Sequence, residues 1–268
     1  MQEYIKTDQQ LHWLSQVLAK AGRAFVPEKP DDSHTNLYFD PLAGKLCSRW
    51  IEKDKQKFML TLNLASMQFE WVDRYFDVKQ STSALGKSME ELEKEVAVFP
   101  GSLGLPSEKI YEALHFEIPD YGFDSIAQKD ISEEGIRQWK FFRYLANLTS
   151  LDFLGFLQAE NEIRIWPHHF DTGVYAQLTP GFGIGFGLAM EDSMAGQPYF
   201  YLVGYASDGQ LQYKNLPAPE TGKWITGDNW NGAILPLGEL DTKKLKANLS
   251  AIAGFIRLTG IWYLSQKL

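Results

Sequence analysis

The side chains best suited to chemistry gather in one short run in the second half of the chain. His168, His169 and Asp171 lie within four residues of one another, and Glu191 follows after two strand-like segments. Imidazole nitrogens and carboxylate oxygens bind zinc, iron or manganese, and a histidine held by a carboxylate acts as a general base. This run is therefore a candidate divalent-metal or acid–base site.

The spacing of apolar residues divides the two histidines between opposite faces of a strand. Apolar side chains recur at every second position from Phe170 to Leu178 and from Phe182 to Met190, which is the period of a strand with one buried face. Adjacent residues of a strand point to opposite faces. His169, Asp171 and Glu191 are therefore the candidate catalytic groups and metal ligands of such a site. The alternative is that His169 and Glu191 form only a cross-strand polar pair, because no HExxH or paired CxxC motif accompanies them.

Keeping both apolar rows on one face fixes the expected register, since a slip of one residue would turn an entire row to solvent. The expected pairs are Leu178–Phe182, Tyr175–Gly185, Gly173–Gly187, Asp171–Ala189 and His169–Glu191 in the first hairpin, and Glu191–Tyr199, Ala189–Tyr201 and Gly185–Tyr205 in the second. The opposite face, which we call the glycine face, is then a trough with a floor of Gly183, Gly185 and Gly187 and walls of tyrosine.

Glycine inside a strand usually marks the close approach of another group. One interpretation is structural, with tyrosine rings, a helix or a tryptophan filling the trough. The other is a trough open to a sugar or another planar or amphipathic molecule. The candidate ligand-binding residues are Tyr175, Gly185, Tyr199, Tyr201, Tyr205, Trp224 and Trp230. A nucleotide fingerprint is rejected, because its glycines belong at a strand-to-helix turn.

Composition narrows the class of protein. The 268 residues are 44% hydrophobic and 22% charged, and the net charge is −8. An acidic chain disfavours nucleic acid and anionic membrane surfaces as partners. Cys47 is the only cysteine, so no intrachain disulfide forms, and it is expected to be a packed thiol. With no secretory pattern at the N-terminus and no apolar run near ~20 residues, we expect a soluble cytoplasmic protein.

The elements that must position these residues alternate between helices and antiparallel strands. Helices are predicted over 8–21, from Ser88 to Pro100, over 132–158 and from Asp241 to Trp262. A capping box of Ser88 and Glu91 opens the second of these helices. Strands are predicted over 36–39, 45–52, 57–64 and 68–76 in the first half. In the second half they are predicted over the apolar rows 170–178 and 182–190, over the segment that begins near Tyr199, and over 211–213. Residues 107–115 are expected to form a short helix, and 217–231 a loop.

This order predicts an α+β fold with two similar halves, each a helix, an antiparallel β-meander and a helix. The halves span about 1–105 and 131–268 and are joined by 106–130, within a single compact unit of residues 1–268. Helix-then-strand order in both halves suggests an internal duplication.

The run IRIWPHHFDTGVYAQL, preceded by Arg137-Gln138-Trp139 and followed by Pro198-Tyr199-Phe200-Tyr201, resembles the uncharacterised bacterial family DUF5996. The resemblance covers about 132–206, and His168-His169 departs from it. It implies no activity.

Two functions follow from these observations. The first is a non-catalytic binding or interaction protein that holds a small molecule on the glycine face, without a cofactor. The alternative is a metal-dependent hydrolase-like enzyme that uses His169, Asp171 and Glu191 with a divalent metal.

Overall fold

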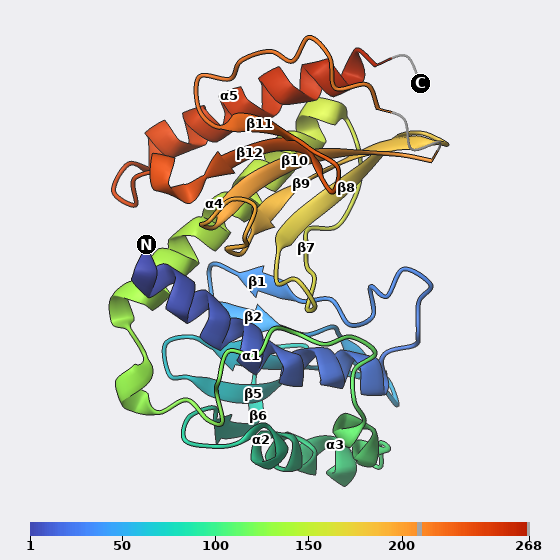
Figure 1. Cartoon of the computed structure of the whole chain (residues 1–268). Helices are drawn as coiled ribbons and strands as arrows, with labels where there is room; N and C mark the ends of the chain where they lie inside the picture. Colours follow the sequence, from blue (N-terminus) through green and yellow to red (C-terminus); the bar gives the residue numbers. More distant parts are fainter. Residues whose placement is uncertain (208–210, 267–268) are drawn as a thin grey trace. The chain divides into compact units, whose positions relative to one another are not determined.

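The computed structural model describes residues 1–207 and 211–266. Its fold is α+β, with helices beside antiparallel sheets (Figure 1). The chain divides into two compact units. The N-terminal unit comprises Gln2–Lys140 and Ile165–Phe170, and the C-terminal unit comprises Met1, Phe141–Arg164 and Asp171–Leu268. This division differs from the expected single unit with halves at 1–105 and 131–268, because its boundary falls inside a long helix. An internal duplication is not confirmed.

The N-terminal unit contains a sheet in the order β1-β2-β4-β5-β6, with β3 paired to β4. Its strands are β1 (Tyr38–Asp40), β2 (Lys45–Cys47), β3 (Ile51–Lys53), β4 (Gln56–Asn63), β5 (Gln68–Asp73) and β6 (Val78–Ser83). Its helical elements are α1 (Gln2–Phe25), α2 (Met89–Val96), α3 (Val98–Ser102), η1 (Ser107–Tyr111), η2 (Gln128–Asp130) and the first turns of α4 (Glu133–Leu157). The meander was predicted, but β6 was missed because its sequence, VKQSTS, is polar and largely exposed.

The core of this unit forms where helices cover one face of the sheet. The predicted apolar stripe of α1 is completely buried at Leu11, Leu14 and Leu18, although the helix is longer than expected at both ends. On the sheet, the buried indole of Trp71 donates a hydrogen bond of 2.9 Å to the carbonyl of Val96 at the end of α2. Such a bond satisfies one of the carbonyl groups that the end of a helix leaves unpaired.

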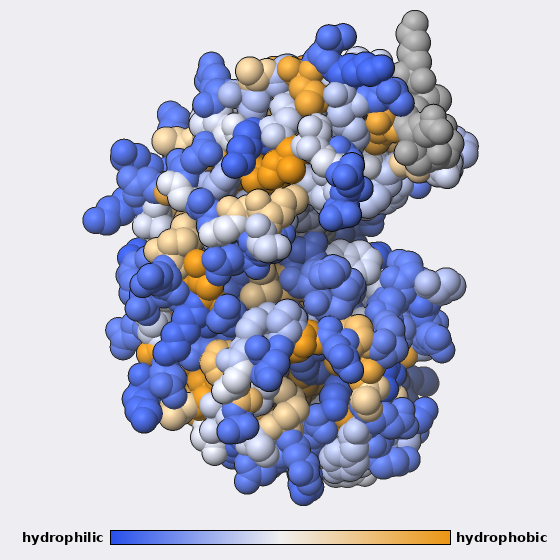
Figure 2. Space-filling model, viewed as in Figure 1, coloured by the Kyte–Doolittle hydropathy of each residue, from blue (hydrophilic) through white to orange (hydrophobic). Residues whose placement is uncertain are grey.

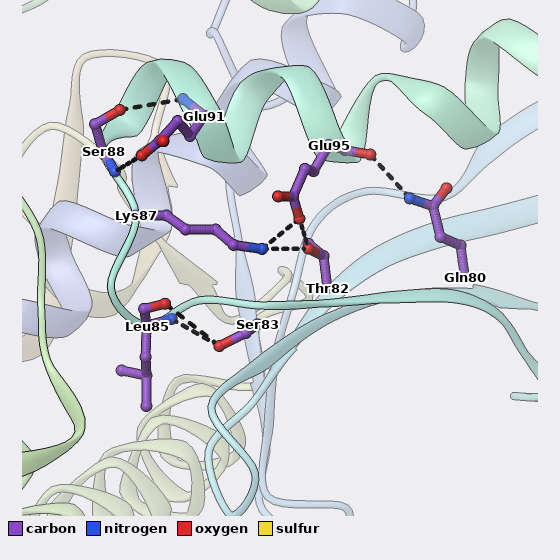
Figure 3. Close-up of polar contacts among 8 residues, drawn as sticks. All are labelled: Gln80, Thr82, Ser83, Leu85, Lys87, Ser88, Glu91 and Glu95. Carbon is purple, nitrogen blue, oxygen red and sulfur yellow. Dashed lines mark hydrogen bonds and ion pairs between the residues drawn. The ribbon is translucent and has the colours of Figure 1, made fainter.

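The capping box at the start of α2 is confirmed (Figure 3). The Glu91 amide donates to the Ser88 hydroxyl at 3.3 Å, and the Ser88 amide donates to the Glu91 carboxylate at 2.8 Å. The same helix is attached to β6 through Glu95, whose carboxylate accepts from Lys87 and Thr82 and whose carbonyl accepts from Gln80 at 2.8 Å. The start of α2 is therefore set by local sequence, and its position by contacts to the sheet.

Replacing Ser88 with alanine removes the acceptor of the Glu91 amide. We expect a loss of about 1 kcal/mol in the free energy of unfolding, measured by urea titration. Ser88→Asp keeps an acceptor at the cap and should retain most of that stability. An unchanged stability of Ser88→Ala, or equal losses in the two variants, would contradict a stabilising role of the Ser88 acceptor.

The C-terminal unit contains the second sheet, in the order β11-β12-β10-β9-β8-β7. Its strands are β7 (Arg164–Ile165), whose second residue belongs to the N-terminal unit, β8 (Thr172–Thr179), β9 (Phe182–Ala189), β10 (Tyr199–Ala206), β11 (Lys223–Thr226) and β12 (Asn231–Pro236). They are followed by η3 (Leu237–Glu239) and α5 (Leu245–Leu264). The β11–β12 hairpin replaces the loop predicted over 217–231, whose many turn-forming residues hid two short strands. Residues 211–213 form no strand, and Asp241 lies in the turn before α5 and does not cap it.

Helices α4 and α5 supply the core on the apolar face of this sheet. Phe153 of α4 packs on Phe186 of β9 with ring centroids 5.5 Å apart, and Phe186 stacks on Phe200 of β10 at 5.9 Å. Tyr263 of α5 lies against Gly204 of β10. The predicted apolar rows are confirmed on this face, because Val174, Phe182, Ile184 and Phe186 are buried there.

The register of the β8–β9 hairpin is confirmed at its centre. Tyr175 opposes Gly185 and Gly173 opposes Gly187, as predicted. An irregularity between Gln177 and Thr179 places Thr179, not Leu178, opposite Phe182.

The β9–β10 hairpin is displaced by two residues from the prediction, with Tyr199 opposite Ala189 and Tyr201 opposite Gly187. Its turn is longer than expected, because Asp192 accepts from the Met194 and Ala195 amides and extends the loop. A displacement of two residues keeps every side chain on its predicted face.

Hydrophilic residues cover most of the molecular face seen in Figure 2, and hydrophobic residues appear there in small, separate patches. Scattered patches of this size are ordinary for a protein surface. Within the described residues, no helix combines the length and apolar character needed to cross a bilayer.

The glycine face as candidate functional site

The floor of the glycine face is covered by the protein's own tyrosine rings. A Cβ atom at Gly185 would lie 3.0 Å from the Tyr205 ring, and one at Gly187 would lie 2.7 Å from the Tyr201 hydroxyl. At Gly183 a Cβ would overlap the ring of Tyr175. The structural interpretation of the glycines is therefore supported, because each one makes room for a cross-strand ring. The surface offered to solvent is an aromatic layer and not a bare backbone trough.

Tyr201 is fixed at one end of this layer by Asp171. Its hydroxyl donates a 2.6 Å hydrogen bond to Asp171 Oδ2, and it also lies close to Gly173 on β8. Burial raises the pKa of Tyr201 well above its usual value, and the negative charge of Asp171 and the hydrogen bond to it add to that effect. Tyr201 therefore stays a neutral donor, and Asp171 acts as its acceptor.

Tyr205 and Tyr175 form the accessible part of the layer. Tyr205 is 53% exposed, and its ring lies 5.8 Å from that of the half-buried Tyr175 at an angle of 62°. The Tyr175 hydroxyl donates to the exposed Gln177 at 3.0 Å, while Asn161 binds the Tyr175 carbonyl. The Gln177 amide nitrogen donates to the carbonyls of Thr179 and Phe182, so its oxygen, which has a second acceptor position, is the group that two ring surfaces leave beside them for a ligand.

Tyr199 lies on the same side of β10, but it is only 6% exposed. Its hydroxyl donates a 2.6 Å hydrogen bond to Asp192 in the β9–β10 loop, and burial followed by this bond raises its pKa. Tyr199 therefore attaches the loop to the sheet, and the prediction that it contacts a ligand is not supported.

The two predicted tryptophans have different positions. Trp224 pairs with Ala233, and Ala233 pairs with Leu202 of the apolar face, so Trp224 also lies on the apolar face. Its ring is 5.0 Å from that of Trp262 in α5. Trp230 lies over Gly232, since a Cβ there would be 2.5 Å from its ring. Register places Gly232 on the glycine face. Trp224 is thus a half-buried residue of the apolar face, whereas Trp230 extends the aromatic layer.

The histidine run is a turn, and strand alternation does not apply to it. Residues 167–169 form the turn and Phe170 has a φ of 55°, so β8 begins only at Thr172. The rings of His168 and His169 are 4.3 Å apart, which corrects the prediction that they point to opposite faces. His168 also lies 5.5 Å from Phe116, and His169 is exposed.

The predicted site residues are divided between the two units. His169 belongs to the N-terminal unit, while Asp171 and Glu191 belong to the C-terminal unit, where Glu191 is exposed in the loop after β9. Within residues 1–207 and 211–266, no group of three or more histidine, cysteine, aspartate or glutamate side chains is placed to hold a metal ion. The metal hypothesis thus stays a prediction without an assembled ligand set.

Sequence reasoning missed the residues that hold the histidine turn. His12 Nε2 and Gln16 Nε2 both lie 2.9 Å from the Pro167 carbonyl, and the His12 ring stacks on Phe170 with centroids 5.1 Å apart. His12 Nδ1 lies 2.7 Å from the Tyr121 hydroxyl. The sequence feature that could have indicated this contact is the pair of polar residues at positions 12 and 16, which lie on one side of the predicted helix.

Cys47 matches its predicted role as a packed thiol. It is 4% exposed, beside Met59 and Val72. Burial, followed by the charge of Asp40, raises its pKa to about 12, which suppresses the thiolate that a nucleophile requires.

Comparison of the chain with protein-family models, curated proteins and solved structures found no match. The resemblance to DUF5996 stays a prediction, and the assignment of function rests on the geometry of the chain itself.

Proposed function

We propose that the protein is a non-catalytic binding module that holds a saccharide against the aromatic layer of the glycine face. One observation carries the proposal: three neighbouring strands place Tyr175, Tyr201 and Tyr205 over glycines, and the outermost ring, Tyr205, remains half exposed. Tyrosine combines an apolar ring surface with a polar hydroxyl, which suits an amphipathic, flat ligand.

Polar groups around the rings support a saccharide over a purely apolar ligand. Gln177 and Asn161 are exposed beside Tyr175, and Asp171 is half-buried next to Tyr201. Sugar rings present C–H surfaces that cover an aromatic ring and hydroxyl groups that bind amides and carboxylates. A few polar groups beside an apolar surface are the usual means of orienting such a ligand.

We also propose a cytoplasmic location, with no nucleic-acid or membrane partner. The single cysteine, buried and unpaired, supports a reducing compartment. The net charge of −8 opposes attraction to phosphate backbones or anionic lipid headgroups.

Calorimetric titration with cellohexaose, xylohexaose and chitohexaose tests the proposed function. At least one of the three should bind saturably, and Tyr205→Ala should weaken its affinity about tenfold, equivalent to about 1.4 kcal/mol, because a stacked ring surface is lost. Tyr111→Ala is the matched control, since Tyr111 is 48% exposed in η1 of the other unit.

Absence of binding by all three hexasaccharides, or equal affinities for wild type and Tyr205→Ala, would contradict the proposal. The competing metalloenzyme hypothesis has its own test. Metal analysis of the purified protein and of His169→Ala should show no stoichiometric metal in either if the binding-module proposal holds.

A further inference from the structure

The N-terminal unit contains a pocket that is separate from the glycine face. Its volume is about 450 Å³, and it lies beside α3 at the end of the sheet where β4, β5 and β6 meet. A volume of this size is in the range of small-molecule sites. Most of the described residues that line it belong to an apolar group or a charged group, and Gln56 and Tyr75 complete the lining.

Phe58, Phe99 and Leu103 form the apolar part of the lining. The rings of Phe58 and Phe99 meet edge to face with centroids 5.6 Å apart, and Phe99 lies equally close to the buried Trp71. Phe58 is only 3% exposed, so this part of the pocket is backed by the core of the unit. Such a surface favours an aromatic or aliphatic ring.

The charged part of the lining has an excess of positive charge. Lys57, Arg74 and Lys79 line the pocket, and Asp73 is the only carboxylate among the described lining residues. The Asp73 carboxylate already accepts from Lys79 at 2.7 Å and from the Tyr75 amide at 2.8 Å. The local charge is therefore positive on a chain whose net charge is −8.

Arg74 is the cation best placed to meet a ligand. Its guanidinium donates to the carbonyl of Lys55 and lies 6.0 Å from the ring centre of Tyr75, which is 75% exposed. Within the described residues, no carboxylate forms an ion pair with Arg74. Lys57, in contrast, binds Glu52 at 2.6 Å. A guanidinium has further donors available and binds carboxylate and sulfonate oxygens in a fixed geometry.

We propose that this pocket binds a small aromatic anion, with the ring against Phe58, Phe99 and Leu103 and the acidic group at Arg74 and Lys57. The two parts of the lining are complementary to the two parts of such a ligand. This site does not depend on saccharide binding at the glycine face.

The test uses anilinonaphthalene sulfonate, an aromatic sulfonate that fluoresces when bound, and its neutral counterpart phenylnaphthylamine. Wild type should bind the sulfonate with one-to-one stoichiometry, and the neutral compound at least tenfold more weakly. Leu103→Trp, which fills the pocket, and Arg74→Gln, which removes the charge, should each weaken sulfonate binding about tenfold. Lys94→Gln is the control, because the Lys94 side chain is 62% exposed away from the pocket and pairs with Glu90.

Circular dichroism of each variant checks that the fold is retained. Lys57→Gln is a second variant that removes a positive charge from the pocket, and it should affect folding little because the Lys57 side chain is 49% exposed. The proposal is overturned if the neutral compound binds as tightly as the sulfonate, if folded Leu103→Trp and Arg74→Gln bind like wild type, or if the sulfonate does not bind.

Discussion

Replacing Trp139 with alanine should lower the free energy of unfolding of the protein by about 4 kcal/mol. Trp139 is completely buried in α4, where its ring meets Phe39 edge to face at 5.1 Å and stacks on Phe170 at 6.0 Å. Its indole nitrogen donates a 2.7 Å hydrogen bond to the Asp8 carboxylate in α1. The substitution therefore creates a large cavity and removes a donor from a buried carboxylate.

Urea titration of wild type and two comparison variants separates these effects. Trp139→Phe keeps most of the ring but not the donor, and we expect it to cost about 1 to 3 kcal/mol. Trp50→Ala makes the same change at a residue that is 39% exposed and should cost less than about 1 kcal/mol. If Trp139→Ala unfolds the protein completely, Trp139→Phe still tests the hydrogen bond. Similar losses for Trp139→Ala and Trp50→Ala would contradict this account of the core.

Replacing Gly187 with alanine should cost about 3 kcal/mol, which is large for the addition of one methyl group. A Cβ at this position would lie 2.5 Å from the backbone oxygen of Thr172 and 2.7 Å from the Tyr201 hydroxyl. The side chain can move, but the backbone oxygen belongs to the neighbouring strand β8. The methyl group must therefore separate β8 from β9 or displace Tyr201 from Asp171.

Gly185→Ala is the matched control, because it makes the same change two residues away in the same strand. Its Cβ would be 3.0 Å from the ring of Tyr205, which is half exposed and free to shift. We expect this variant to change stability by less than about 1 kcal/mol in urea titration. Equal effects at the two glycines would show that close approach by the backbone does not explain Gly187.

The strand pairing at the centre of the second sheet could be predicted because the apolar rows exclude displacements by one residue and the short turn at Thr179-Pro180-Gly181 leaves little room for a displacement by two. A slip of one residue would expose Phe182, Ile184 and Phe186 together, so Tyr175 had to oppose Gly185. The second hairpin allowed a displacement of two residues, because this keeps every face unchanged. The hydrogen bonds that Asp192 accepts in the loop select one of these alignments. They cannot be inferred from the spacing of apolar residues.

The histidine run could not be placed from periodicity. Phe170 and Thr172 fit the apolar alternation of β8, but Phe170 adopts a left-handed backbone conformation that ends the strand pattern before Asp171. What fixes that conformation is packing against His12 in α1 and Trp139 in α4, both distant in sequence. Non-Gly residues seldom adopt a positive φ, so no feature of the residue pattern predicts the turn there.

The aromatic character of the candidate site was predictable, whereas its depth was not. The alternation of glycine and tyrosine on facing strands placed the rings on one side of the sheet, as observed. Whether the rings stand at the edges or lie over the glycines depends on side-chain rotamers, and the structure shows that they lie over them. The position of Trp224 differs from the prediction because its turn-forming neighbours predict a loop where the structure has strand β11.

Fluorine NMR of the fluorotyrosine-labelled protein tests the central claim most directly. The resonances of Tyr205, Tyr175 and Tyr111 are assigned from their Tyr→Phe variants, and the three hexasaccharides are then added in turn. We predict that at least one hexasaccharide shifts the Tyr205 and Tyr175 resonances saturably and leaves that of Tyr111 unchanged. Unchanged Tyr205 and Tyr175 resonances with all three hexasaccharides, or shifts confined to other tyrosines, would contradict a ligand-binding role for the glycine face.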